Sequence, residues 1–221
     1  QEGAQIDHFR LMQESAQAYH VTTTQVDQHK DSVFNSTSFA RGAAIARNQL
    51  HVGLDAPGAT CTLKGLYLTD GSQHIDNNIN IDHLKPHTRS DLSFKGILAD
   101  KSKAVFSGQV IVHKDAQKAF AVQSDKNLLL SEESRINTKP SLLIYADDVQ
   151  CMHGATAGAV TDEAVFYMQS RGLDLETATR YLIQGFAREV IDTITLDGFR
   201  DYMDTYFIDS LPTYAFQRKS S

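Results

Sequence analysis

The feature that most limits the fold of this 221-residue chain is the grouping of its apolar residues. Before residue 150 they come in short runs broken by Gly, Asn, Asp and Ser, and no window there keeps a 3.6-residue period over three turns. Short runs bounded by turn residues predict strands. Examples are Phe9–Met12, Ala43–Ile45, Leu66–Leu68, Val110–Val112, Leu128–Leu130 and Leu142–Tyr145. Many short, closely spaced strands favour a sandwich, a barrel or a solenoid.

A weak internal repeat favours the solenoid among these three architectures. The segments around Gly65, Gly96 and Gly108 share a pattern in which an apolar residue precedes the glycine by two positions and further apolar residues follow it. A solenoid would explain the repeat, because each coil would stack similar side chains on similar side chains.

After residue 160 the sequence changes to helical signals. Thr161 followed by Asp162 and Glu163 predicts a helix N-terminus, and Gly172 predicts its end. Further helices are predicted from Leu175 to Ile194 and from Phe199 to Ile208. The longer one has an expected apolar stripe of Ala178, Tyr181, Leu182, Phe186, Val190 and Ile194, and Gly185 within it suggests close contact with a neighbour. The chain therefore divides into a mainly β domain, residues 1–158, and a small C-terminal helical domain, residues 159–221.

Composition and missing motifs exclude several classes of protein. The net charge of −6 argues against nucleic-acid binding, and no apolar run approaches the roughly 18 residues of a membrane span. Two cysteines are too few for a disulfide scaffold or for a four-cysteine site within one chain. There is no phosphate-binding loop and no glycine-rich dinucleotide motif or nucleophile elbow. Because residue 1 is Gln, we expect a processed chain or the C-terminal part of a longer one.

Two segments could hold a metal. His74, His83 and His87 lie in an Asn- and Asp-rich stretch, which we interpret as turns with side chains bonded to backbone rather than as a metal site. The second segment, Asp147–Thr156, contains Cys151 and His153, which share one face of an extended strand. This pair could be half of a metal site completed by another chain, a thiol activated by an imidazole, or a buried Cys beside a hydrogen-bonded His.

The second segment also resembles a known family. Asp147-Asp148-Val149-x-Cys151-x-His153-Gly154-Ala155-Thr156, followed by Phe166-Tyr167-x-x-Ser170-Arg171-Gly172, resembles the C-terminal half of the SufD family of the Suf iron–sulfur cluster assembly machinery. The resemblance continues upstream through His83-x-x-Pro86, Phe94–Ile97, Phe106-x-Gly108 and Gln123–Leu130, and covers roughly residues 60 to 195. It implies a right-handed parallel β-helix (β-solenoid) followed by a short helical domain, preceded in full-length members by a helical region.

The resemblance also implies a role. Members of the family are cytoplasmic, non-catalytic scaffolds that pair with the paralogue SufB through the β-helix and bind the ATPase SufC through the C-terminal helices. A cluster is built at or near the interface with SufB. An open solenoid end would also favour a homodimer when SufB is absent. The resemblance implies no tightly bound cofactor for this chain alone. A nascent iron–sulfur cluster, and a reduced flavin as a further candidate, belong to the assembled complex.

Individual residues receive roles from the same resemblance. SufB is similar but carries a cysteine at the position of Ser124 and a glutamate at that of Gly154. This chain therefore resembles the partner that supplies a histidine, which maps onto His153, with Cys151 as a second transient iron–sulfur ligand. The predicted SufC contacts are Phe166, Tyr167, Arg171 and Gly172. For Arg171, an interaction with the helix dipole is an equal alternative.

Two other functions remain open on the sequence alone. Parallel β-helices also form polysaccharide lyases and hydrolases, and the carboxylates between Asp76 and Asp82 could be such a catalytic cluster. A purely structural solenoid is the third alternative. It predicts that Cys151 and His153 are both buried and fully bonded within one chain.

Overall fold

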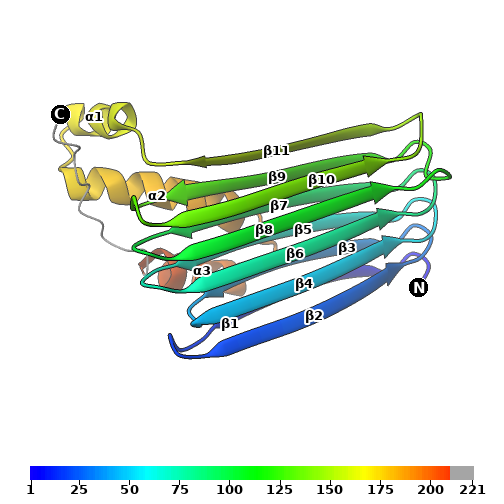
Figure 1. Cartoon of the computed structure of the whole chain (residues 1–221), viewed down its shortest axis with the longest axis horizontal. Helices are drawn as coiled ribbons and strands as arrows, with labels where there is room; N and C mark the ends of the chain where they lie inside the picture. The colour runs from blue at the N-terminus through cyan, green and yellow to red at the C-terminus, as the bar shows by residue number, and fades with distance from the viewer. Residues whose placement is uncertain (210–221) are drawn as a thin grey trace.

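A computed structural model gives the structure of the chain and describes residues 1–209 (Figure 1). In this part, eleven strands precede three helices. The strands are β1 (Gln5–Gln13), β2 (Tyr19–Gln28), β3 (Val33–Arg41), β4 (Ile45–Leu54), β5 (Thr60–Thr69), β6 (His74–His83), β7 (Arg89–Leu98), β8 (Lys103–Val112), β9 (Phe120–Leu129), β10 (Arg135–Ile144) and β11 (Gln150–Gly158). The helices are α1 (Asp162–Ser170), α2 (Leu175–Ile191) and α3 (Asp197–Asp209). Residues 210–221 of the predicted helical domain lie outside the described residues.

The strands form two parallel sheets that face each other. The odd-numbered strands follow the order β1-β3-β5-β7-β9-β11, and the even-numbered strands follow β10-β8-β6-β4-β2. The chain therefore alternates between the sheets, and two successive strands make one coil (Figure 1). This is the predicted parallel β-solenoid, and the prediction is confirmed.

Side chains alternate between the interior of the solenoid and its outer faces, as strand geometry requires. In β6 the pattern is regular, because Ile75, Asn77, Ile79, Ile81 and His83 are buried while the residues between them are partly exposed. The inward residues form one continuous apolar core along the axis. The segment from His74 to His83 is therefore a strand and not the predicted set of turns, since its alternating Ile residues need an interior to enter.

The glycine repeat has a different physical basis from the one predicted. Gly65 does not stack on Gly96. It lies opposite Phe94, because the register pairs Leu63 with Leu92. A Cβ atom on Gly65 would lie 2.3 Å from the Phe94 ring, and one on Gly96 would lie 2.4 Å from the Tyr67 ring. Gly65 and Gly96 each make room for an aromatic ring of the adjacent coil, whereas Gly108 makes room for the Gln123 side chain. The apparent repeat between Gly65 and Gly96 is offset from the true register by two residues.

The helical signals are confirmed, with two corrections. Thr161 caps α1 by accepting a hydrogen bond from the Ala164 amide at 3.3 Å, and Gly172 follows the helix with φ +91°. In α2 the buried stripe includes Ile183 and Ala187, whereas Tyr181 is half exposed. Gly185 makes no close contact, since nothing lies within 4 Å of a Cβ at that position.

Helices α2 and α3 cover the outer face of the odd-numbered sheet (Figure 1). The second core formed there contains Phe39, Leu66, Leu68 and Ile97 from the strands and Ile183, Ala187, Val190, Ile191, Ile194, Met203 and Phe207 from the helical part. A buried lysine ties the two layers together. Lys95 on β7 donates to the Phe186 carbonyl at 3.1 Å and pairs with Glu189 at 2.5 Å. The helical part is therefore anchored to the solenoid across a shared apolar interface.

Candidate functional site at the end of the solenoid

The last strand, β11, lies at an open end of the solenoid. It pairs with β9 on one side and is the final strand of its sheet in the described chain. From Met152 to Ala159 every residue is exposed. An unpaired strand edge presents backbone N–H and C=O groups that can pair with another chain. This end is therefore the natural place for contact with a second polypeptide.

Cys151 and His153 sit on the inward face of this uncovered coil. Cys151 lies opposite Ala121 and His153 opposite Gln123, two buried inward residues of β9. Cys151 is partly buried against the main core, but His153 is exposed and makes no hydrogen bond or ion pair with the described residues. The purely structural alternative required both side chains to be buried and bonded, so the exposure of His153 contradicts it.

The thiol of Cys151 is not activated in this structure. Partial burial raises the pKa of Cys151, and a hydrogen bond with the Ala121 backbone opposes this only in part. A reactive cysteine needs the opposite shift. The hypothesis that His153 activates the thiol is therefore not supported, and a ligand role for Cys151 depends on a metal ion displacing the proton.

The pair cannot hold a metal ion by itself. Among the described residues, no group of three or more His, Cys, Asp or Glu side chains is arranged to bind a metal. A thiolate and an imidazole are good ligands for iron, but two ligands leave a coordination sphere half filled. Further ligands would have to come from outside the described residues, and the open end leaves β11 accessible to another chain.

The two positions that distinguish the paralogues in the resemblance are direct neighbours. Ser124 and Gly154 are register partners across the β9–β11 pair. They belong to the outward-facing set, whereas Cys151 and His153 belong to the inward-facing set. Cys151, His153 and Gly154 therefore lie within a few residues of one another on β11, and Ser124 lies beside Gly154 on the adjacent strand β9.

The residues predicted to contact SufC lie on and just after α1. Phe166 and Tyr167 are 71% and 57% exposed, which is unusual for large apolar side chains and marks a surface available to a partner. Arg171 follows the helix and folds back onto it, with its guanidinium donating to the Tyr167 hydroxyl at 2.8 Å and lying 4.9 Å from the ring centroid. Gly172 provides the left-handed turn that ends the helix.

The carboxylates proposed for a carbohydrate-active enzyme do not form a catalytic pair. Asp76 and Asp82 lie six residues apart on one extended strand, which separates them by about 20 Å at roughly 3.3 Å per residue. Catalytic carboxylates of glycosidases lie about 5 to 9.5 Å apart. Both side chains also have partners, since Asp76 pairs with Arg47 at 3.4 Å and Asp82 accepts from His51 at 2.6 Å. The enzyme alternative is therefore not favoured.

The histidines of the same segment are not metal ligands together. His83 is completely buried and bonded at both ring nitrogens, to Thr88 and Ser90, each at 2.8 Å. Burial lowers the pKa of His83 to about 4, although Asp82 opposes the shift. His83 is therefore a neutral core residue.

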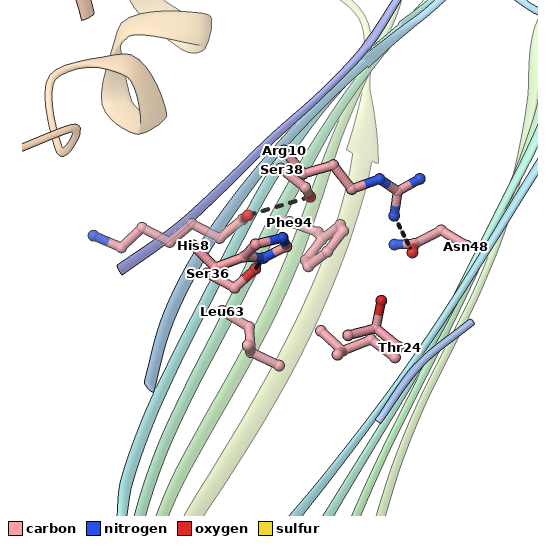
Figure 2. Close-up of a pocket in the computed structure, with 10 residues that line it drawn as sticks. His8, Arg10, Thr24, Ser36, Ser38, Asn48, Leu63 and Phe94 are labelled. Atoms are coloured by element: carbon pink, nitrogen blue, oxygen red, sulfur yellow. Dashed lines mark hydrogen bonds between the residues drawn. The ribbon is translucent and has the colours of Figure 1, made fainter. Parts of the chain in front are cut away.

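Sequence reasoning missed a polar cavity at the opposite end of the solenoid (Figure 2). His8 and Arg10 point inward from β1. The His8 ring bonds Ser36 at 2.9 Å, and the Arg10 guanidinium donates to Asn48. The alternation of polar and apolar residues in β1 was the available signal. The cavity of about 20 Å³ has room for about one water molecule, so it does not form a pocket for an organic substrate.

No helix in the described part of the chain combines the length and the apolar character that crossing a bilayer requires.

Comparison with known proteins agrees with this architecture. Residues 1–186 match the family model described as "SUF system FeS cluster assembly, SufBD core domain". The chain is 37% identical over 195 residues to an iron–sulfur cluster assembly SufBD family protein of Synechocystis, covering 88% of the chain and 43% of the relative. It is 32% identical over 197 residues to the iron–sulfur cluster assembly protein SufD of Escherichia coli, covering 89% and 47%.

A plant relative is similar to the same extent. The chloroplastic protein ABCI7 of Arabidopsis thaliana is 36% identical over 204 residues, which is 91% of the chain and 42% of that protein. The chain thus spans a little less than half the length of the curated relatives it matches. Since the family model covers most of the chain, the solenoid and its last strand belong to the SufBD core domain of the SUF iron–sulfur cluster assembly system, and the chain is a member of that family.

Proposed function

We propose that this chain is a cytoplasmic, non-catalytic scaffold subunit of the Suf machinery that completes an iron–sulfur assembly site together with SufB. The main observation that supports this proposal is the position of His153, two residues from Cys151 on the uncovered face of the last strand. Its ring is exposed and makes no hydrogen bond to the described residues. A neutral imidazole and a thiolate are suitable iron ligands, and two of them make an incomplete site. The nascent cluster is cargo of the assembled complex and not a resident cofactor of the chain.

Complementarity of the ligand sets supports SufB as the partner. In SufB, a cysteine and a glutamate stand where this chain has Ser124 and Gly154, which cannot act as soft or acidic ligands. A chain that lacks these ligands but exposes His153 is suited to a heterodimer in which each subunit supplies what the other lacks. The unpaired edge of β11 gives such a heterodimer backbone groups to pair with.

SufC is the proposed partner of the helical end. Phe166 and Tyr167 expose their rings on α1, which packs against α2 of the same chain. Because α2 is anchored to the sheet through Lys95, a force applied to the helices by nucleotide-driven movement of SufC would reach the solenoid. The chain itself has no phosphate-binding loop, so we assign ATP hydrolysis to SufC.

The proposal is tested in the complete complex. Co-expression of the full-length protein with tagged SufB and with SufC should yield all three proteins after affinity purification. His153→Ala should leave this assembly intact and reduce the amount of cluster formed by about tenfold or more, measured by the visible absorbance of the reconstituted cluster. Loss of a ligand removes a direct bond to iron. Substitution of residues that only hydrogen-bond to the ligands already reduces metal affinity or activity 10–100-fold.

Met152→Ala is the matched control, because Met152 is the exposed neighbour of His153 on the opposite face of β11. It should form clusters as the wild-type complex does. If the His153→Ala complex formed clusters at the wild-type rate, the ligand role would be wrong. If SufB did not retain the chain, the proposed pairing would be wrong.

A further inference from the structure

One coil below the open end, a chain of polar side chains interrupts the apolar core. Gln123, Asp125 and Asn127 point inward from β9 and are less than 5% exposed. The Tyr67 hydroxyl donates to Asn127 Oδ1 at 2.6 Å, and Asn127 Nδ2 donates to Asp125 Oδ2 at 2.7 Å. Gly96 makes this chain of bonds possible, because a Cβ there would lie 2.4 Å from both the Tyr67 ring and the Asn127 oxygen.

Three oxygen atoms in this region lack a hydrogen-bond partner in the described structure. They are Gln123 Oε1, Asp125 Oδ1 and Thr138 Oγ1. One N–H of the Gln123 amide donates to the Gly108 carbonyl at 3.0 Å. Of the three oxygens, only the Thr138 hydroxyl carries a proton when the carboxyl group is ionised. When Asp125 is ionised, the region carries a negative charge and three oxygens without a hydrogen-bond partner, and both features favour a positively charged ligand.

The charge of Asp125 has no counter-charge among the described side chains. No lysine, arginine or histidine forms an ion pair with it, and the adjacent Lys126 points outward and pairs with Glu189 at 3.9 Å. Burial raises the pKa of Asp125 to about 6, and Thr138 and Asn127 oppose the shift. Thr138 thus lies close to the carboxyl group, although the two make no hydrogen bond of normal geometry. Buried ionised groups are found paired or bound to metals.

Asp125 is fully buried, and on the side of the open end the only β-strand paired with β9 is β11. The residue above Asp125 in the register is Ala155, and the one above Asn127 is Ala157. Both are small and exposed. Cys151 and His153 lie on the same inward face of β11, so these four residues of β11 separate the polar side chains of β9 from the open end.

We propose that Asp125, Gln123 and Thr138 form an oxygen-lined site for a hard divalent cation of the Mg²⁺, Mn²⁺ or Fe²⁺ class inside the last covered coil. Carboxylate, amide and hydroxyl oxygens are the ligands such ions prefer, and small divalent ions keep several waters when few protein ligands are present. This site is separate from Cys151 and His153, because these residues and Asp125 do not form one metal-binding group. The identification of the ion as iron held for cluster assembly rests on the proposed function. The binding of a cation at this site does not depend on it.

The test uses the full-length protein without SufB, with Mn²⁺ as a paramagnetic probe followed by electron paramagnetic resonance. Wild type should bind one Mn²⁺ per chain. Asp125→Asn keeps the shape and removes the charge, and it should weaken binding at least tenfold. Thr138→Val, a second variant of nearly equal volume, should weaken binding by a smaller factor. Unchanged melting temperatures would show that both variants fold.

The double variant Cys151→Ala/His153→Ala separates this inference from the proposed function. It should bind Mn²⁺ within twofold of wild type even when cluster assembly is lost. Loss of Mn²⁺ binding in the double variant, retention of full binding in Asp125→Asn, or no binding by wild type would each overturn the site. Competition by Fe²⁺ under anaerobic conditions at concentrations where Mg²⁺ does not compete supports iron as the ion, and equal competition by Mg²⁺ overturns that assignment.

Discussion

The central coils and the last coil of this solenoid place similar residues in opposite circumstances. His83 and His153 both point inward, but His83 is covered by coils on both sides and bonded at both nitrogens, whereas His153 has a neighbouring coil on one side and is exposed. A repeat protein buries its core only where the next repeat is present. The place of a coil in the stack therefore decides whether an inward polar side chain is part of the core or available to a ligand.

The two cysteines repeat this contrast within a single column of stacked residues. The register places Phe34, Cys61, Ser90, Ala121 and Cys151 one above another along the odd-numbered sheet. Cys61 is completely buried, and burial raises the pKa of its thiol well above the ordinary range. Cys151 ends the column and remains partly exposed. Only the end of the column offers a thiol to another molecule.

The largest expected effect comes from removing an aromatic ring from a central coil. Phe106 on β8 is fully buried and lies 5.3 Å from the Phe94 ring, centroid to centroid. Phe106→Ala should lower the free energy of unfolding by about 3–5 kcal/mol, because it removes transfer energy and leaves a cavity. The change is measured by urea denaturation monitored by circular dichroism.

The matched variant in the last coil is Met152→Ala, which truncates a side chain that is 57% exposed. Exposed substitutions of this kind change stability by about 0.5 kcal/mol or less. Similar losses for the two variants would show that the last coil is as tightly packed as the centre, contrary to the contrast drawn above.

A second prediction concerns the pH dependence that a covered histidine introduces. The pKa of His83 is about 4 in the folded chain, against about 6.5 for an unfolded histidine. Between these values the unfolded state binds more protons than the folded state. The free energy of unfolding should therefore rise as the pH rises through this window, and the increase should be complete above about pH 6.5. The pKa difference of His83 between the folded and unfolded states corresponds to an increase of about 3 kcal/mol in the free energy of unfolding, at roughly 1.4 kcal/mol per pKa unit.

His83→Gln should remove this part of the slope, because glutamine does not titrate. Unfolding free energies at pH 4.5 and 7 measure the effect, and Met152→Ala should keep the full wild-type difference. A slope that survived in His83→Gln would assign the pH dependence to other groups.

The sequence allowed the architecture to be predicted because its signals are local. Short apolar runs between turn residues identify strands, and the cap at Thr161 and the stop at Gly172 identify the limits of α1. The candidate pair Cys151 and His153 was also found, since alternation along a strand places residues i and i+2 on one face.

What could not be predicted depends on contacts between distant residues. The glycine repeat suggested a register two residues away from the true one, because interlocking of Gly65 with Phe94 is a property of two packed coils. The buried stripe of α2 includes Ile183 rather than Tyr181, since the sheet beneath it determines which face is covered. The polar group around Asp125 was missed because its members come from β5, β9 and β10, each unremarkable in its own segment.

The smallest effects are expected from alanine substitution of two glycines, one in a central coil and one in the last coil. In Gly65→Ala the new Cβ meets the Phe94 ring at 2.3 Å, and that ring cannot move freely because it packs against Phe106. Overpacking of this kind costs about 1–3 kcal/mol. In Gly154→Ala nothing lies within 4 Å of the new Cβ, and the backbone is not in the left-handed region. Here the loss of unfolded-state entropy should stabilise the protein by about 0.4–1 kcal/mol.

The opposite signs of these two substitutions make the comparison sensitive even though each effect is small. Thermal unfolding of both variants gives the signs directly. Adding Phe94→Leu to Gly65→Ala sharpens the cause: if the clash with the ring is responsible, the double variant should be more stable than the sum of the two single effects, because the smaller side chain leaves room for the methyl group. Additive losses would mean that Gly65 is required for its backbone rather than for the aromatic ring above it, and the explanation of the glycine repeat would have to change.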